Sequence, residues 1–516
     1  MIRRAGAAAL ALVLCLLLCA CRGGTEPVHD PDAFWDSDEL LVPAPETDEA
    51  AELPAVTAFT LPYLVGQTLD PVTCLDGIQQ TVGALLYEGL FALDDTFTPQ
   101  PLLCGDHSVD KTGKVHTFRL RGDASFSDGS GVSANDVLAT YRRAQASERY
   151  IARFTNIQSM RVQHGALVIT LKTPDSALPA LLDIPIVKSG SDRGSVPIGS
   201  GPYVFANDEN GAFLLRRSDR AYGSEPPLER IELTAVKDEA SAAYLFSAFN
   251  LHLLTADLMG SSPAAALSNA DISDAPSTSL LYLGFNLGRD VCGNEALRRA
   301  MQSGFDRENV VASLLAGHAV PAQFPIHPAS PLYPAALESA YDATSYTTAV
   351  TESGIDAAAP RELTLLVNSD NAFKVSLADY LCRELSVPGL TLTVRPLPWA
   401  DYLWAVQKND FDLYLGELRL TADWNLAPLL ATGGALNYGG VRDAELDRLL
   451  AEFLAAESPE TAAALCTRLS ESAPIIPIVF KDISLLTTEG LIQGTAPTAA
   501  DPFRGFADWT IQSPAS

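Results

Sequence analysis

An uncharged apolar run opens the chain, between a short basic segment and a cysteine. Arg3 and Arg4 come first, residues 5–18 are apolar without a charge, and the small residue Ala20 precedes Cys21. A membrane-spanning helix needs about 20 apolar residues, so this run is short for a span. The layout is that of an export signal that is removed from the mature protein.

The residues Leu18-Cys19-Ala20-Cys21 resemble the bacterial lipobox, in which cleavage takes place directly before a cysteine that receives a lipid. Cys19 stands where that motif usually has a small residue. The resemblance implies a signal peptide over residues 1–20 and lipidation at Cys21. Lipidation would hold the protein at the outer face of the cytoplasmic membrane or in the periplasm. The alternative is a secreted protein without a lipid, cleaved near the same position.

The next segment is strongly acidic. Residues 26–52 include ten acidic residues, several prolines and no Lys or Arg. Such a segment repels itself and stays extended. We therefore predict an acidic disordered tether over residues 21–54, and a folded body that begins where apolar residues return near Phe59.

Beyond the tether, apolar residues recur at both the strand period and the helix period, which is typical of an α/β protein. Residues 115–121 alternate with period two and predict a strand, and residues 133–136 resemble a capping box that starts a helix. Strands at 363–367 and 390–394 flank a helix at 374–385, and this βαβ spacing predicts a partly parallel sheet. Further strands are predicted at 166–172 and 280–285, and further helices at 295–303 and 306–315.

The composition is that of a globular chain with a large excess of acid. The 516 residues are 47% hydrophobic, and 63 acidic residues against 35 Lys and Arg give a formal net charge of −28. The length allows about three domains. A nucleic-acid backbone would be repelled by this surface, so we expect no nucleic acid as a partner. Solubility is the simplest reason for the acidity.

The cysteines and histidines give no metal-site spacing. Cys74 and Cys104 are close in sequence, and an oxidising compartment allows a disulfide between them, although connectivity does not follow from spacing. The sequence has no CxxC pair, and its seven His are scattered. We therefore expect no metal and no cofactor, and His residues from distant segments stay an open alternative.

Several short motifs follow one another in an order that resembles the family 5 extracellular solute-binding proteins of ABC importers, the group of dipeptide- and oligopeptide-binding lipoproteins. Each motif is weak alone, and the order and separations carry the resemblance over nearly all of residues 60–512. The motifs are Thr68-Leu69-Asp70-Pro71 with 87–91, 117–121 with 126–137, 197–203, 282–286 with 297–300 and 305–308, and 411–413 with 422–424, 437–438 and 443–449.

The resemblance implies an α/β fold of the periplasmic-binding-protein-like type II, cluster C, in which two lobes close on a ligand. Lobe I would take residues 55–277, with an extra subdomain inserted at about 75–190, and residues 480–516 would return to it. Lobe II would take residues 278–479. The family also implies a peptide or other small solute as ligand, an ABC permease complex as partner, and a monomer.

Asp423 is the residue that the resemblance singles out. In peptide-binding members an acid in this loop pairs with the α-amine of the ligand, and a carboxylate in a closed cleft would hold a cation well. Ala422-Asp423-Trp424-Asn425 resembles the family pattern, but Leu426 replaces a second acid and Leu420 replaces a tryptophan. The alternative is that Asp423 caps or braces its own loop.

Other candidate ligand residues lie near this loop or near the first strand. Arg419 could grip a carboxylate with two hydrogen bonds or pair with Asp423, and Asn437 could hydrogen-bond a ligand backbone. Aromatic side chains could form pockets or stack on a ligand, or they could belong to the core, which we favour for Trp404. The aromatic candidates are Trp424, Trp404, Tyr402 and Tyr438, and the candidates of the first lobe are Thr68, Leu69, Asp70, Tyr87 and Glu88.

The predicted function is capture of di- to oligopeptides and their delivery to a permease. The same fold could instead bind a nickel chelate, an oligosaccharide, an opine or haem, or belong to a sensor lipoprotein. An extracellular hydrolase is the remaining class. The sequence has no Gly-x-Ser-x-Gly elbow, no His-Glu-x-x-His and no Ser-x-x-Lys with matching partners, so we expect no enzyme activity.

Overall fold

The computed structural model describes residues 58–512. The predicted signal peptide (1–20), Cys21 and the tether (21–54) lie outside these residues. Within residues 58–512, no helix is long and apolar enough to cross a membrane.

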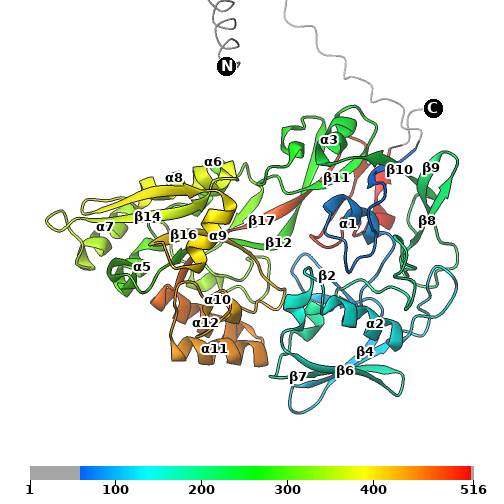
Figure 1. The fold of residues 1–516 in the computed structure, drawn as a ribbon, viewed down its shortest axis with the longest axis horizontal. Coiled ribbons are helices and arrows are strands. Elements are labelled where there is room, and N and C mark those ends of the chain that lie inside the picture. The colour runs from blue at the N-terminus through cyan, green and yellow to red at the C-terminus, as the bar shows by residue number, and fades with distance from the viewer. Residues whose placement is uncertain (1–57, 513–516) are drawn as a thin grey trace, which may run out of the picture. The chain divides into compact units, whose positions relative to one another are not determined.

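A seven-stranded mixed sheet forms the largest layer of the fold (Figure 1). Its β14 and β15 run parallel and are joined by α8, so the predicted βαβ unit is confirmed. Side chains alternate between the two faces of the sheet: Leu365 and Leu415 enter one apolar core, and Leu366 and Tyr414 enter the other. The strands, in order across the sheet, are β11 (Leu253–Ala256), β17 (Ile475–Thr488), β12 (Ala270–Phe285), β16 (Leu413–Arg419), β14 (Arg361–Asn368) and β15 (Leu390–Leu397), with β13 (Ala319–Pro321) beside β17.

Helices cover both faces of this sheet and, with β12 to β16, make up the second lobe. Two of the predicted helix starts are confirmed. Asp306 caps α6 by accepting from the N–H of Asn309 at 3.1 Å, and a helix begins at Glu295. The helices are α4 (Asp290–Gly293), α5 (Glu295–Met301), α6 (Arg307–Leu314), α7 (Ala343–Glu352), α8 (Ala372–Leu385), α9 (Trp399–Gln407), α10 (Ala427–Leu430), α11 (Ala444–Ala455) and α12 (Pro459–Ser472).

The first lobe is built on a four-stranded sheet that joins the N-terminal strand to later segments. Strand β1 pairs in parallel with β10, and Trp509, near the end of the chain, packs in the same apolar core as Leu61. The elements are β1 (Thr60–Leu64), β10 (Arg230–Val236), β9 (Gly211–Arg216) and β8 (Tyr203–Asp208), the helices α1 (Gly77–Ala84) and α3 (Glu239–Ser247), and the C-terminal pair β18 (Ile492–Gln493) and β19 (Thr510–Ile511).

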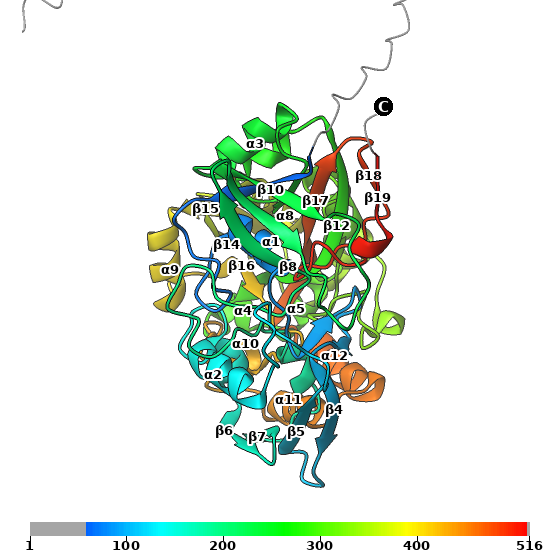
Figure 2. The same ribbon diagram turned by 90° about the vertical axis from the view of Figure 1, so that its right-hand side faces the viewer.

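A separate antiparallel sheet forms the subdomain of the first lobe (Figure 2). Helix α2 (Ala134–Ala144) packs on it, and the predicted capping box is confirmed, because Ser133 and Asp136 bond reciprocally. The strands are β4 (Cys104–Val109), β5 (Val115–Leu120), β7 (Ala166–Leu171) and β6 (Ile157–Gln163), beside the hairpin β2 (Phe91–Leu93) and β3 (Pro99–Pro101). Short 3-10 helices lie at Ile151–Phe154, Leu178–Leu181, Pro263–Ala266, Ala335–Leu337 and Phe506–Asp508.

The long strands β12 and β17 connect the two lobes. One end of their ladder lies beside β11 and the other beside β16, and the register shifts between Pro276 and Ser279. At this bulge the Ser277 hydroxyl donates to the carbonyl of Lys481 at 2.6 Å. A two-lobed α/β fold is therefore confirmed, while the domain boundaries stay predictions.

Candidate functional site

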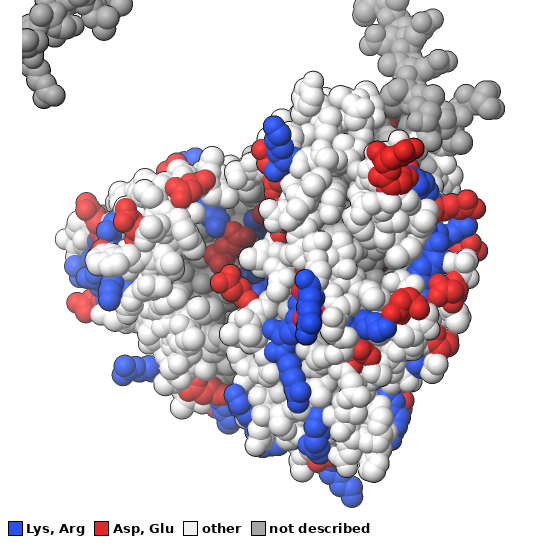
Figure 3. Space-filling view, turned by 45° about the vertical axis from the view of Figure 1, so that its right-hand side comes forward, with Lys and Arg blue, Asp and Glu red and all other residues white. Residues whose placement is uncertain are grey.

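A pocket of about 400 Å³ opens on one face of the seven-stranded sheet, beside the strands that connect the lobes. Residues of β12, β16, α8, α9 and the loop at 436–438 line it. Figure 3 shows a hollow in the surface between the two lobes, with acidic and basic side chains inside it. Its volume lies in the range typical of small-molecule sites.

Aromatic rings form much of the pocket wall. Tyr282 and Tyr414 share a hydrogen bond at 3.2 Å between their hydroxyls, and the Tyr402 hydroxyl donates to the carbonyl of Leu415 at 2.8 Å. Burial raises the pKa of Tyr282 to about 12, so its hydroxyl stays protonated at neutral pH. The ring of Trp399 stacks on that of Tyr402 with 5.7 Å between the ring centroids, and Trp399 is 50% exposed.

Glycine makes room for these rings. A Cβ on Gly416 would lie 2.5 Å from Cζ of Tyr282, which is closer than side chains tolerate. The absence of a side chain at this position of β16 therefore lets the tyrosine lie flat against the strand and shape the pocket.

A chain of alternating charges runs from the pocket to the strands between the lobes. Lys374 and Glu417 line the pocket and pair at 2.7 Å, and Lys481 on β17 pairs with the same carboxylate at 3.0 Å. Lys481 also pairs with Asp257, which follows β11. Burial acts to raise the pKa of Glu417, but the two lysines outweigh it and hold that pKa below its ordinary value. Glu417 is therefore a carboxylate with its charge already matched.

Arg419 is the third charged residue of the pocket, and no acid pairs with it in the part of the chain that the structure describes. Arg419 is exposed to solvent, but partial desolvation by the surrounding protein lowers its pKa, and the nearby charge of Arg149 from the first lobe lowers it further. Arginine keeps its charge in proteins, so the guanidinium remains a cation. The pocket thus has two cations and one carboxylate.

The structure brings together three of the predicted ligand residues, Arg419, Tyr402 and Tyr438, in this pocket. Trp404 lies on the same helix as Tyr402 but outside the pocket. It is 58% exposed, so its assignment to the core is wrong. Its place on α9 turns the ring to solvent.

Asn437 has a structural role in its own loop, and its predicted contact with ligand stays a prediction. Its amide donates to the carbonyls of Ala431 at 3.0 Å and Val441 at 2.9 Å, and it accepts from the N–H of Val441 at 2.8 Å. These bonds close the loop that carries Tyr438, and they engage both the donor and the acceptor side of the amide.

Asp423 and Trp424 also lie outside the pocket. Asp423 is 2% exposed, and its Oδ1 accepts from the N–H of Asn425 at 3.2 Å, which is the loop-bracing alternative. The ring of Trp424 is buried against Phe97 of the first lobe and Phe480 of β17, so Trp424 belongs to the core.

The two lobes meet near Asp423. The N–H of Ser176 in the subdomain donates to the carbonyl of Leu454 at 3.0 Å, and the N–H of Glu457 donates to the Ser176 hydroxyl at 2.9 Å. Burial and the charge of Asp423 raise the pKa of Asp175 to about 7 and that of Glu457 to about 9. This contact therefore holds three carboxyl groups close together.

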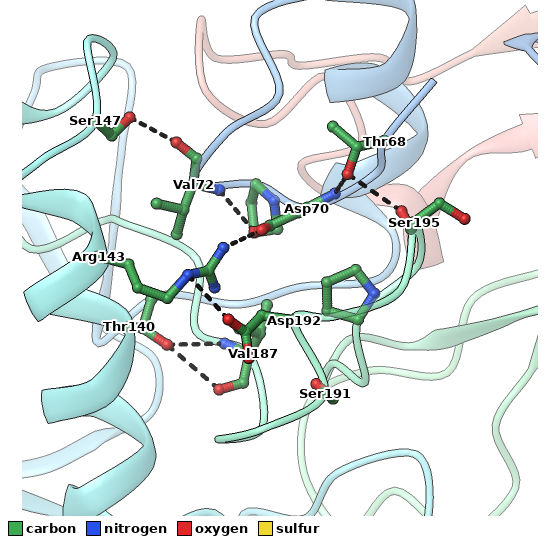
Figure 4. A network of polar contacts seen from close by, with 12 residues as sticks. Thr68, Asp70, Val72, Thr140, Arg143, Ser147, Val187, Ser191, Asp192 and Ser195 are labelled. Atoms are coloured by element: carbon green, nitrogen blue, oxygen red, sulfur yellow. Dashed lines mark hydrogen bonds and ion pairs between the residues drawn. The ribbon is translucent and has the colours of Figure 1, made fainter. Parts of the chain in front are cut away.

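The predicted candidates of the first lobe have internal partners. Figure 4 shows Thr68 and Asp70 in a polar network in which Arg143 pairs with Asp70. Asp70 also accepts from the N–H of Val72 at 3.1 Å, and Leu69 is buried in the core. None of these three candidates lines the pocket, and their contact with a ligand stays a prediction.

Tyr87 and Glu88 also have internal partners, and their contact with a ligand stays a prediction. The Tyr87 hydroxyl donates to the carbonyl of Pro197 at 3.1 Å, and its ring is part of the core of the first lobe. Glu88 pairs with Arg220 and accepts from the Tyr222 hydroxyl. Both side chains therefore stabilise the first lobe.

The possible disulfide between Cys74 and Cys104 is not formed, because both are free thiols. The Cys74 thiol donates to the carbonyl of Asp76 at 3.6 Å, and the Cys104 thiol donates to that of Asp106 at 3.4 Å. Each thiol is thus satisfied within its own segment. Among residues 58–512, no group of three His, Cys, Asp or Glu is arranged to hold a metal ion.

Sequence reasoning missed Lys374, Trp399, Glu417 and Lys481. One signal was available: Trp399 precedes Tyr402 by three residues, so a helix there places both rings on one face. The charged partners come from segments more than 40 residues apart, and only the sheet order brings them together.

The family model and the relatives that match this chain are both solute-binding proteins. Residues 98–434 match the family model described as bacterial extracellular solute-binding proteins, family 5 Middle. The chain is 25% identical over 473 residues to the glutathione-binding protein GsiB of Salmonella choleraesuis (strain SC-B67), covering 84% of this chain and 91% of that one. It is 24% identical over 457 residues to GsiB of Escherichia coli (strain K12), covering 81% and 87%.

Solved structures share the fold. The substrate-binding protein CtaP of Listeria monocytogenes superposes with a TM-score of 0.71 at 20% identity, covering 89% of this chain and 99% of that one. The murein tripeptide-binding protein MppA in its unliganded open form gives 0.72 at 18% identity, covering 89% and 98%. NikZ of Campylobacter jejuni in complex with Ni(L-His) gives 0.62 at 19% identity, covering 88% and 99%.

Proposed function

The chain belongs to the bacterial extracellular solute-binding proteins of family 5, and on that premise we propose that it captures short peptides between its two lobes and delivers them to an ABC permease. The observation that carries the peptide proposal is the pocket beside the connecting strands, which combines an aromatic wall with both signs of charge. Peptides present apolar side chains together with charged ends, so this lining suits them.

The names of the relatives support a small peptide. GsiB is named for glutathione and MppA for a murein tripeptide, and both ligands are short peptides with carboxylates. A pocket of about 400 Å³ fits one or two residues of such a ligand, with the rest in the space between the lobes.

Thermal unfolding against a ligand panel tests this proposal. Purified mature protein would first be examined by native mass spectrometry for a bound molecule, and then by thermal shift with di- to pentapeptides, nickel chelates and oligosaccharides. A true ligand at a hundredfold excess over its Kd should stabilise the folded state by about 3 kcal/mol. If a chelate or sugar raises Tm while peptides of every length leave it unchanged, the peptide proposal is wrong.

An anionic metal chelate is the second candidate. The unpaired Arg419 would suit the carboxylates of such a chelate, and NikZ holds Ni(L-His) on the same fold. A rise in Tm with Ni-histidine, absent with histidine alone and with nickel alone, would favour this candidate over peptides.

Membrane anchoring through Cys21 is part of the proposal. A lipid there would keep the two lobes near the permease, with residues 22–54 as a tether. Replacement of Cys21 by Ser should abolish labelling with a radioactive fatty acid and block processing or release the protein, and it should leave ligand affinity unchanged. Continued labelling of Cys21→Ser would contradict the anchor site.

A further inference from the structure

We propose that Arg419 and Lys374 form an anion-binding end of the pocket that takes a ligand carboxylate, while Trp399 and Tyr438 hold an apolar or aromatic group next to it. This inference rests on the proposed capture of peptides. It narrows the ligand to short peptides whose C-terminal residue has a bulky apolar side chain and a free carboxylate.

The charge of the pocket is the first argument. Lys374, Glu417 and Arg419 are its charged lining residues, which gives a net charge of +1 in a chain whose formal net charge is −28. A neutral or cationic ligand group would leave Arg419 unmatched. A carboxylate would match it, and the guanidinium can donate two parallel hydrogen bonds to the carboxylate.

The isolation of Arg419 is the second argument. Arg143 and Arg153 pair with acids, as the excess of acid in this chain favours. No acid pairs with Arg419 or Arg149 anywhere in residues 58–512. The Arg149 guanidinium donates only to the carbonyls of Pro71 at 3.2 Å and Cys74 at 3.3 Å. Arg149 lies in the first lobe and Arg419 in the second, so an anion held at Arg419 would be attracted from both sides of the cleft.

Lys374 can serve the ligand without leaving an unpaired acid. Its partner Glu417 also pairs with Lys481, whose side chain is 6% exposed and held by Asp257 as well. When Lys374 turns toward a ligand carboxylate, Glu417 therefore keeps a buried counter-ion. Of the two lysines that pair with Glu417, Lys374 is therefore the one that can turn toward a ligand.

The exposed aromatic wall is the third argument. Trp399 and Tyr438 line the pocket, and half of the Trp399 surface is open to solvent. The Tyr438 hydroxyl has no hydrogen-bond partner among the described residues. An apolar side chain against these rings would bury surface that is otherwise in water, and an aromatic one would add stacking. Both rings lie in the same pocket as Arg419, so one amino-acid residue of a ligand can reach all of them.

Isothermal titration with matched peptides tests the assignment on the purified mature protein. The probes are Ala-Phe, Ala-Ala-Phe, Ala-Ala and Ala-Ala-Ala, each as the free acid and as the C-terminal amide. We expect the acids ending in Phe to bind at least about tenfold more tightly than their amides, because a charge-assisted hydrogen-bond pair is lost in the amide. Acids ending in Phe should also bind more tightly than those ending in Ala.

Variants assign these preferences to residues. Arg419→Gln should bring the acid-to-amide affinity ratio close to one, and Arg383→Gln, at an exposed position on α8, should leave it unchanged. Trp399→Leu should reduce the preference for Phe over Ala, and Trp404→Leu on the same helix should not. Each readout is a ratio within one variant, so a partly unfolded sample lowers both affinities and leaves the ratio intact.

The experiment distinguishes a failure of the anion-binding assignment from a failure of the peptide proposal. If acids and amides bind alike, or if Arg419→Gln weakens both equally, the anion-binding assignment is wrong while peptide capture stands. If no peptide of the series binds, the peptide proposal fails and this assignment fails with it.

Discussion

The ammonium of Lys481 lies 3.0 Å from the carboxylate of Glu417, which connects a strand between the lobes to the wall of the pocket. Lys481 is almost fully buried and also pairs with Asp257. Lys481→Met would leave Glu417 with Lys374 alone and Asp257 without its partner. We expect a loss of roughly 2 to 3 kcal/mol in the free energy of unfolding, below the usual cost of breaking a buried pair because Glu417 keeps one lysine. Urea denaturation followed by circular dichroism measures it.

Lys408→Met is the control for this change, because Lys408 is exposed at the end of α9. It should change the unfolding free energy by less than about 0.5 kcal/mol. Equal losses in the two variants would show that the buried charge chain contributes nothing specific.

Much of the fold could be predicted from periodicity and motif order, since these are local properties of the chain. The parallel pair around α8, the capping box at Ser133 and the cap at Asp306 all follow from short segments. The two-lobed architecture was implied by the family resemblance that the order of the motifs carries.

The site was less predictable, because its members depend on sheet order and on competition between partners. Arg419, Tyr402 and Tyr438 were named from the sequence and line the pocket, but Lys374 and Glu417 meet only after β14 and β16 pair. Residues in the motifs that carry the resemblance, such as Asp70, have partners within the scaffold. A motif shows that a residue type is needed at a position, and it leaves open whether a ligand or the fold needs it.

Asp423→Asn separates the two roles considered for this acid. The amide can still accept from the N–H of Asn425, and it removes a charge from a buried group of carboxyls. We expect unchanged peptide affinity and a small rise in Tm, because the variant removes a buried charge that burial disfavours. Titration with free and N-acetylated peptides checks this. A loss confined to peptides with a free amine would restore Asp423 as the amine-binding residue.

Glu457→Gln should change how stability depends on pH. Burial, followed by the charges of Asp423 and Asp175, raises the pKa of Glu457 from its ordinary 4.5 to about 9. The folded state then binds this proton more tightly than the unfolded state. The stability that Glu457 contributes is therefore present below about pH 4.5 and is lost as pH rises toward 9. Glutamine does not titrate, so the variant should be increasingly more stable than the parent protein from pH 5 to pH 9.

Calorimetric Tm values at pH 5, 7 and 9 measure this difference. A gain of about 1 kcal/mol corresponds to roughly 2 °C in a chain of this size. Glu209→Gln, at an exposed position in the turn after β8, is the control and should give a constant difference. A Glu457→Gln difference that does not grow with pH would mean that the carboxyl ionises normally.

Gly416→Ala should narrow the pocket and destabilise the second lobe. The new Cβ would lie 2.5 Å from Cζ of Tyr282. The ring of Tyr282 is buried, and its hydroxyl is hydrogen-bonded to that of Tyr414. Overpacking of this kind costs about 1–3 kcal/mol, and the displaced ring should also weaken ligand binding. Gly77→Ala is the matched control, because a Cβ there meets nothing within 4 Å. It should be neutral or stabilise by up to about 1 kcal/mol.

Adding Tyr282→Leu to Gly416→Ala provides the decisive comparison. The smaller side chain leaves space for the new methyl group, so the double variant should lose less stability than the two single losses added together. Strict additivity would mean that Gly416 and Tyr282 do not compete for the same space, and the account of how this strand shapes the pocket would be wrong.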